Sequence, residues 1–194
     1  DVPTGFDTTR FLSTIDVSGR DGVRLDDAWA DGAQAYLGIT LAGFPNLFML
    51  YGPNTNNGSI IFQIECQVDY LLRHLQRMTR EKLAWIEVKP EVMADYNRRL
   101  QADLDAVAVW HSGAHDYYRA ASGRIVTQWP HGMDRYREIT AANDDDAYLG
   151  GELPGGKSGR GSENKVSFIA AVQTTEAGHP LKVCLKKLEF TKEA

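Results

Sequence analysis

The chain has 194 residues, of which 43% are hydrophobic, and a formal net charge of −5. This length fits one ordinary domain or two small ones, and it is too short for a complete enzyme with two nucleotide cofactors. The acidic balance argues against bulk electrostatic binding of nucleic acid, which needs clustered Lys and Arg. No apolar run approaches the ~18 residues of a membrane span, and Cys66 and Cys184 indicate a reduced setting. We therefore predict a cytoplasmic protein without a membrane partner.

The basic residues change in kind near residue 143. Residues 1–143 hold 12 Arg and 2 Lys, whereas residues 144–194 hold 1 Arg and 6 Lys. A Gly-rich run, Gly150–Gly161, follows this change. One interpretation is a single domain with a flexible loop. The other is a boundary between regions 1–143 and 144–194, with the Gly-rich run as the junction. The chain begins at Asp1 without a Met, which predicts a cut or processed N-terminus.

In the first region, a strand, a turn and a helix are expected in succession. The apolar run Asn46–Tyr51 predicts a buried strand of a parallel sheet. The segment Gly52–Ser59 (GPNTNNGS) enforces a turn. An amphipathic helix of about five turns is predicted to follow, with Ser59 as its N-cap. Its apolar residues recur at steps of three and four, and they are Ile60, Ile61, Ile64, Val68, Leu71, Leu72, Leu75 and Met78.

A strand–turn–helix unit directs backbone N–H groups and the positive end of a helix dipole to the edge of a sheet. This geometry suits an anionic or electron-rich edge of a ligand. The alternative is an ordinary turn, in which Asn54, Asn56 and Asn57 only satisfy the local backbone. The residues alone leave both interpretations open.

Further elements are expected before residue 143. Leu83–Val88 predicts a strand, the residues after Pro90 predict a second amphipathic helix, and Arg124–Gln128 predicts a short strand. His111 and His115 stand four residues apart, a spacing that binds a metal on some helices. No third ligand motif supports them, so solvated or hydrogen-bonded histidines are the favoured interpretation.

Residues 1–143 resemble the C-terminal third of the flavin-dependent Baeyer–Villiger monooxygenases and are similar to the flavin-containing monooxygenases. Four segments carry the resemblance: TGFDTTRFL, LAGFPNLFMLYGPNTNNGSIIFQIECQVDYLLRHL, MADYNRRLQADL and GRIVTQWP. It implies a partial FAD/NAD(P)-binding, Rossmann-like α/β fold, FAD and NADPH as cofactors, and a small ketone or heteroatom compound as substrate. It also implies that Thr4, Gly5 and Asp7 lie in a linking motif. The residues that it places near the flavin are Gly52, Pro53, Asn54, Thr55 and Asn56.

The sequence departs from this family at the phosphate anchors. The family holds its two dinucleotides with Gly-x-Gly-x-x-Gly turns, and no such run occurs in the chain. We therefore expect one wall of a flavin pocket without a grip on the pyrophosphate. The chain is not expected to be catalytically self-sufficient.

The second region opens on three carboxylates, Asp144, Asp145 and Asp146. Strands at Lys165–Gln173 and Leu181–Lys187 then predict a β-hairpin. Consecutive Asp residues usually form a solvated turn or a helix cap. The alternative is a Mg²⁺ site at the end of a strand, because closely placed carboxylates bind this ion.

DDAYLGGE followed by GGKSGRGSENKVSFIAAVQTTEAGHPL resembles the start of the DDE-type catalytic domain of an insertion-sequence transposase. The resemblance implies a ribonuclease-H-like fragment with Mg²⁺, DNA as a partner, and Asp145 as the first catalytic and metal-binding carboxylate. A lone carboxylate cannot assemble a two-metal site. The favoured hypothesis is a monooxygenase-like fragment fused to a transposase-like one. The alternatives are a transposase fragment, or an inactive fusion product or binding module.

Overall fold

The computed structural model describes residues 9, 11–107, 118–152, 168–174 and 180–187. The chain divides into two compact units. The first comprises Asp1–Phe11 and Ser18–Glu152, and the second comprises Leu12–Val17 and Leu153–Ala194. Residues 144–152 therefore group with the residues before them, whereas composition and resemblance predicted a division after residue 143.

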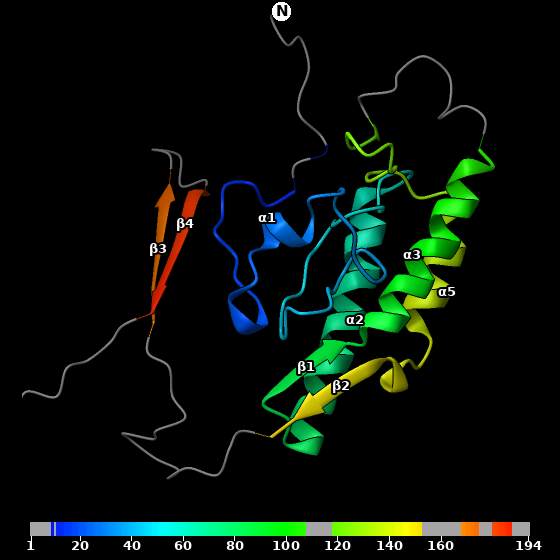
Figure 1. The fold of residues 1–194 in the computed structure, drawn as a ribbon. Coiled ribbons are helices and arrows are strands. Elements are labelled where there is room, and N and C mark those ends of the chain that lie inside the picture. Colours follow the sequence, from blue (N-terminus) through cyan, green and yellow to red (C-terminus); the bar gives the residue numbers. More distant parts are fainter. Residues whose placement is uncertain (1–8, 10, 108–117, 153–167, 175–179, 188–194) are drawn as a thin grey trace, which may run out of the picture. The chain divides into compact units, whose positions relative to one another are not determined.

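Helices α2 (Ile60–Glu81), α3 (Pro90–Asp105) and α5 (Met133–Ala141) lie side by side in the first unit (Figure 1). The predicted start of α2 is confirmed, because the Ser59 hydroxyl accepts a hydrogen bond from the Phe62 N–H at 3.3 Å. Pro90 begins α3, where its fixed φ suits the first turn. The shorter helical segments are η1 (Arg20–Gly22), α1 (Leu25–Ala28) and η3 (Asp145–Ala147).

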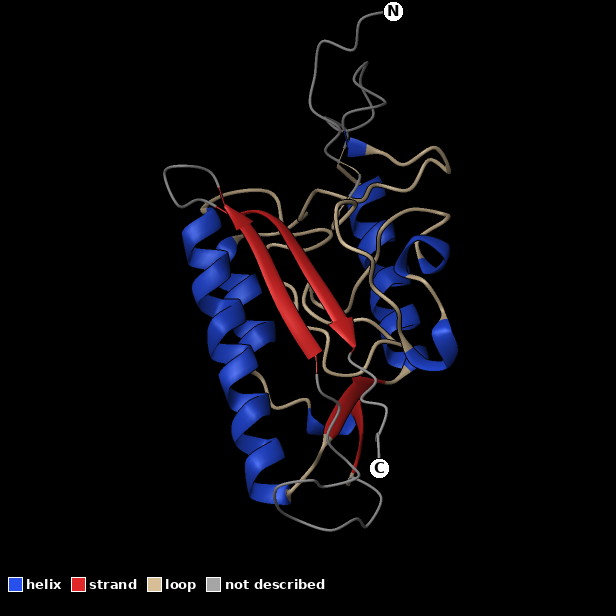
Figure 2. Cartoon of the chain, turned by 90° about the vertical axis from the view of Figure 1, so that its left-hand side faces the viewer, coloured by secondary structure: helices blue, strands red, loops and turns tan. Residues whose placement is uncertain are grey.

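Each unit contains one pair of antiparallel strands, drawn red in Figure 2. In the first unit, β1 (Trp85–Val88) pairs with β2 (Tyr148–Gly151), so that Trp85 lies opposite Gly151 and Val88 opposite Tyr148. In the second unit, β3 (Phe168–Thr174) pairs with β4 (Pro180–Lys187), which confirms the predicted hairpin. No helix within the described ranges is long and apolar enough to cross a bilayer.

The prediction of a strand over Asn46–Tyr51 is wrong. Only Phe48 forms a bridge in this segment, with Thr40. Asn46 and Tyr51 adopt φ values of 60° and 56°, and left-handed residues at both ends are incompatible with a continuous extended strand. The apolar character of the run reflects partial burial in an irregular loop instead.

The segment Arg124–Gln128 also falls short of a regular strand. Ile125 bridges to Arg119, and Gln128 forms a parallel bridge to Asn56. The segment is nonetheless central to the first unit, because Ile125 is fully buried and its neighbours receive hydrogen bonds from the turn that precedes α2.

Helix α2 buries a polar face. Gln63, Gln67, Tyr70 and His74 on this face are fully buried. An amphipathic pattern normally places the apolar side of a helix against the core. Here Ile61 is 71% exposed, and Ile60, Leu72 and Leu75 are 43–49% exposed. The helix is where the sequence predicts it, but its apolar stripe faces outward in the described part of the chain.

The core of the first unit consists of two clusters. One joins α2 to the strand pair and contains Leu37, Ile39, Tyr70, Ile86, Val88 and Tyr148. The other joins α2, α3 and α5 and contains Cys66, Leu100, Leu104, Ile125, Trp129 and Tyr136. Because both clusters contain residues of α2, this helix fixes the relative positions of the other elements.

A close backbone approach sets the position of the turn before α2. Gly38 has a φ of +71°, and a Cβ atom at this residue would lie 2.2 Å from Cγ2 of Thr55 and 2.9 Å from the Pro53 carbonyl oxygen. A side chain at residue 38 would therefore both strain the backbone and push the turn away.

We predict that Gly38→Ala lowers the free energy of unfolding by about 2–4 kcal/mol, because steric overlap adds to the cost of a left-handed backbone. Gly22→Ala is the matched control: Gly22 also has a positive φ, +77°, but a Cβ there meets nothing within 4 Å. It should cost only the backbone strain of about 1–2 kcal/mol. Urea unfolding of both variants measures the difference, and equal losses would contradict the steric argument.

Candidate functional site

The turn that precedes α2 is fastened to a segment far along the chain. The Asn54 N–H donates to the Val126 carbonyl at 2.9 Å, and the Asn56 N–H donates to the Thr127 carbonyl at 2.8 Å. The Trp129 N–H in turn donates to the Asn56 carbonyl at 2.8 Å. These three backbone hydrogen bonds hold the turn alongside segment 126–129, as two neighbouring strands of a sheet are held together.

Two side chains of the turn make structural hydrogen bonds. Asn54 is 2% exposed, and its Nδ2 donates to the carbonyls of Ile125 and Gln128 at 2.9 and 3.1 Å. Its φ of 58° lies in the left-handed region, which Asn tolerates better than most residues. Thr55 is 1% exposed and donates to the Gly52 carbonyl at 2.7 Å. For Asn54, the interpretation as a structural turn residue is therefore supported.

A hollow of about 230 Å³ lies beside the turn. Its lining brings together three of the five predicted turn residues with three others, and comprises Phe11, Tyr51, Gly52, Thr55, Asn56 and Thr127. The Tyr51 hydroxyl donates to Oδ1 of Asn56 at 2.8 Å. Burial raises the pKa of Tyr51, so this hydroxyl stays protonated as a donor. The other two predicted residues, Pro53 and Asn54, are buried in the turn.

Buried polar atoms without partners occur around the same turn. Within the described residues, Oδ1 of Asn54, Oγ1 of Thr127 and both amide atoms of Gln63 have no hydrogen-bond partner. An unsatisfied buried polar group costs about 1–3 kcal/mol, so such groups call for an explanation. Of these residues Thr127 lines the hollow, where a bound polar ligand or water would supply the partner of its hydroxyl.

Sequence reasoning missed Phe11, Tyr51 and Thr127 as lining residues. Tyr51 directly precedes the turn, and this adjacency is a usable signal. Thr127 reaches the hollow through the backbone hydrogen bonds between the turn and segment 126–129. No local sequence pattern predicts this long-range pairing. The predicted residues Thr4, Gly5 and Asp7, and the pair His111 and His115, lie outside the described residues.

We predict that Asn54→Ala lowers the free energy of unfolding by about 2–4 kcal/mol, because it removes two buried hydrogen bonds and puts Ala in a left-handed conformation. Asn57→Ala is the control, since exposed Asn57 makes one side-chain bond, to the Trp129 carbonyl at 3.0 Å. It should cost about 1 kcal/mol. Chemical denaturation followed by tryptophan fluorescence distinguishes the two, and a small effect at Asn54 would contradict its role as a clamp.

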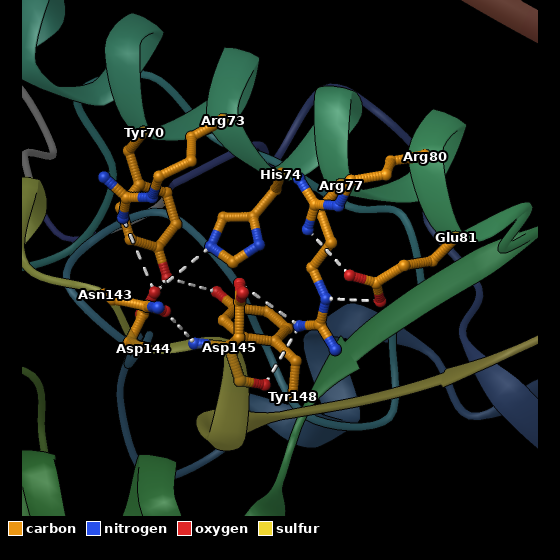
Figure 3. A network of polar contacts seen from close by, with 10 residues as sticks. All are labelled: Tyr70, Arg73, His74, Arg77, Arg80, Glu81, Asn143, Asp144, Asp145 and Tyr148. Atoms are coloured by element: carbon orange, nitrogen blue, oxygen red, sulfur yellow. Dashed lines mark hydrogen bonds and ion pairs between the residues drawn. The ribbon is translucent and has the colours of Figure 1, made fainter.

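Two of the three carboxylates that open the predicted second region, Asp144 and Asp145, contact α2 (Figure 3). Asp144 is 11% exposed and accepts a hydrogen bond from the Tyr70 hydroxyl at 2.5 Å. Its Oδ1 lies 3.4 Å from Nε2 of His74 and 3.5 Å from Nη2 of Arg73. The Tyr70 hydroxyl also lies 2.7 Å from that of Tyr148, which places the Asp144 contacts next to β2.

Asp145, the residue predicted to be catalytic and metal-binding, lies at the start of η3. Its N–H donates to Oδ1 of Asn143 at 3.0 Å, and its carbonyl accepts from Nη1 of Arg77 at 2.9 Å. The Asp145 carboxylate lies 3.5 Å from the same guanidinium. In the described part of the chain, no group of three or more His, Cys, Asp or Glu could hold a metal ion. The catalytic and metal roles of Asp145 stay predictions.

The surroundings of Asp144 favour its ionised form. Burial by itself raises the pKa of this carboxyl, but the contacts with His74 and the Tyr70 hydroxyl and the charge of Arg73 outweigh it, so the pKa is lowered. Burial raises the pKa of Tyr70 and Tyr148, which keeps both hydroxyls protonated. The network therefore pairs a carboxylate acceptor with neutral phenol donors.

We predict that Asp144→Asn lowers the free energy of unfolding at neutral pH by about 1–3 kcal/mol. A carboxyl whose pKa is lower in the folded state stabilises the fold above the unfolded-state pKa of about 4 and loses this effect as pH falls through the folded-state value. The wild-type chain should thus lose stability in acid more steeply than Asp144→Asn. Asp146→Asn, at an exposed position, should follow the wild-type profile; parallel profiles for all three chains would refute the linkage.

Comparison with known proteins gives matches to flavin monooxygenases. The chain is 42% identical over 152 residues to the uncharacterized monooxygenase y4iD of Sinorhizobium fredii, covering 76% of this chain and 23% of that protein. It is 44% identical over 149 residues to a Baeyer–Villiger monooxygenase of Pseudomonas aeruginosa, covering 75% of this chain and 28% of the relative. No family model matches the chain.

The fold matches as well. The structure of OTEMO in complex with FAD and NADP superimposes with a TM-score of 0.66 and 28% identity, over 76% of this chain and 28% of that chain. Neither these comparisons nor the described residues support the transposase-like interpretation of residues 144–194. Over about three quarters of its length, this chain resembles Baeyer–Villiger and FAD-binding monooxygenases, of which it spans about a quarter.

Proposed function

We propose that this chain supplies one wall of the FAD site of a Baeyer–Villiger-type monooxygenase, formed by the turn Gly52–Asn56 and the start of α2. The observation that carries the proposal is the hollow beside this turn, lined in part by Thr127, whose buried Oγ1 has no hydrogen-bond partner among the described residues. The likeness to a solved complex with FAD and NADP supports the same assignment. The fold is then part of a Rossmann-like nucleotide-binding arrangement.

The residues present fit the edge of a flavin ring. Asn56 and Thr127 offer polar atoms at the hollow, while Phe11 and Tyr51 offer aromatic surface. The N-terminus of α2 follows within a few residues, and the positive end of its dipole favours an electron-rich group. A bound flavin would supply the redox chemistry, with NADPH as electron source; this chain's residues would hold and orient the ring.

The same geometry limits what the chain does. The hollow of about 230 Å³ is smaller than the ~300–1,000 Å³ of usual ligand pockets. The sequence also lacks a Gly-x-Gly-x-x-Gly turn for the pyrophosphate. We therefore assign pyrophosphate binding and the NADPH site to the part of such a monooxygenase that this chain does not match. The proposed substrate class is a small ketone or a heteroatom compound; DNA, Mg²⁺ and a cytoplasmic location stay predictions from the sequence.

A covalent chimera tests the proposed function. In the Pseudomonas aeruginosa relative, the segment that matches this chain is replaced by the corresponding residues of this chain. We expect the chimera to retain FAD on gel filtration, detected by visible flavin absorbance, and to oxidise NADPH in the presence of a ketone. A chimera that is folded by circular dichroism but elutes colourless in the presence of FAD would contradict the proposal.

A single substitution then addresses the wall itself. Asn56→Ala in the chimera should weaken FAD binding about tenfold, because a polar group at the hollow is lost. Asn57→Ala is the control, since Asn57 does not line the hollow. Titration with FAD measures both affinities. Equal affinities for the two variants would place the ring elsewhere.

A further inference from the structure

We infer that the outward apolar stripe of α2 is a docking surface for the nucleotide-binding part of a Baeyer–Villiger-type monooxygenase, the part that this chain does not match. We define the stripe by its exposed members Ile60, Ile61, Leu72 and Leu75 and the partly buried residues between them, Ile64, Val68 and Leu71. This inference rests on the proposed function, because both treat the chain as one part of such an enzyme.

The stripe is continuous along the helix. At about 100° and 1.5 Å per residue, its seven members fall within an arc of about 120° and extend over about 22 Å. No charged residue of α2 falls within this arc. Single exposed apolar residues are ordinary, whereas a contiguous apolar surface of this kind marks an interaction site.

The described residues of the first unit leave this face open, because they contact α2 from its other side. The buried side of the helix carries Gln63, Gln67, Tyr70 and His74. Tyr70 belongs to a core cluster, and Gln67 donates a hydrogen bond to the Tyr136 hydroxyl of the other. A rotation of α2 that buried the stripe would break the hydrogen bonds of the buried polar side chains and expose them to solvent. A partner that covers the stripe therefore lies outside the described residues of the first unit.

The position of the stripe, and the length of the relatives that this chain does not match, indicate the occupant. The stripe begins in the first turn of α2, directly after the turn that borders the hollow. Whatever completes the flavin pocket must lie beside this turn, and it then reaches Ile60 and Ile61. The relatives have about three quarters of their length beyond the part that this chain matches, which provides a polypeptide for this position.

The experiment supplies that polypeptide separately. The full 194-residue chain is mixed with the Pseudomonas aeruginosa relative lacking its matching segment, without added FAD, and the mass of the complex is measured by light scattering after gel filtration. We expect a one-to-one complex. The double variant Ile61→Glu and Leu72→Glu should weaken it at least about tenfold, whereas Ala94→Glu, at an exposed position of α3, should not.

A second measurement covers the case in which the shortened relative fails to fold. Leu72→Cys is introduced into the free chain and into the covalent chimera, and the rate of thiol labelling is compared. Covering of the stripe predicts labelling at least about tenfold slower in the chimera. Ala94→Cys, as the matched position on α3, should be labelled at the same rate in both.

Several results would overturn the inference. One is equal labelling of Leu72→Cys in the free chain and in the chimera. Another is a complex that the double variant does not weaken. The third is a homodimer of the 194-residue chain that the double variant abolishes and that the shortened relative does not displace. The last result would assign the stripe to a second copy. The visible flavin absorbance of the chimera is a separate measurement. A chimera with a covered stripe but without bound flavin would support this inference and contradict the proposed function.

Discussion

The side-chain amide of Gln67 joins three parts of the first unit. Its Oε1 accepts from the Tyr51 N–H at 2.7 Å, at the entrance to the turn, and its Nε2 donates to the Tyr136 hydroxyl on α5 at 2.8 Å. That hydroxyl donates onward to the Leu37 carbonyl at 2.7 Å. Because a buried amide must satisfy both its donor and its acceptor, α2 cannot rotate without breaking the turn, the α5 contact and the loop at residue 37 together.

The same face of α2 carries a second polar network one turn further on. Tyr70 contacts Asp144 and Tyr148, and Tyr148 lies 2.8 Å from the Thr40 hydroxyl. The helix is thus positioned by specific polar contacts at two levels, in addition to the packing of Cys66 and Tyr70 in the core clusters. This explains how an apolar stripe can face outward in a unit that is otherwise well packed.

Local patterns in the sequence predicted helices α2 and α3, whereas α5 was not predicted. Ser59 and Pro90 marked two helix starts, and the hairpin of the second unit followed from alternation. The orientation of α2 could not be predicted from the sequence. Periodicity shows that the helix has an apolar side, but it does not show whether the partner of that side belongs to the same unit. The strand expected at Asn46–Tyr51 failed for a related reason: an apolar run reports burial, and two left-handed residues determined the conformation.

The candidate site was predictable only in part. The run of Gly, Pro and Asn located the turn, and the resemblance connected it with a flavin. The sequence could not separate Asn54, which fastens the turn to Ile125 and Gln128, from Asn56, which lines the hollow. This distinction depends on contacts across more than 70 residues of chain. Thr127 enters the hollow through the same long-range pairing.

The pairing of β1 with β2 has a consequence for the order of events during synthesis. The hydroxyl of Thr40 contacts that of Tyr148, which comes 108 residues later in the chain. Tyr70 contacts the carboxylate of Asp144, which comes 74 residues later. A growing chain that has passed residue 143 still lacks both partners, so the hydroxyls of Thr40 and Tyr70 cannot make these contacts until β2 has emerged from the ribosome. Loop closure over such separations is slow. The first unit should therefore reach its final packing late, when its last strand is available.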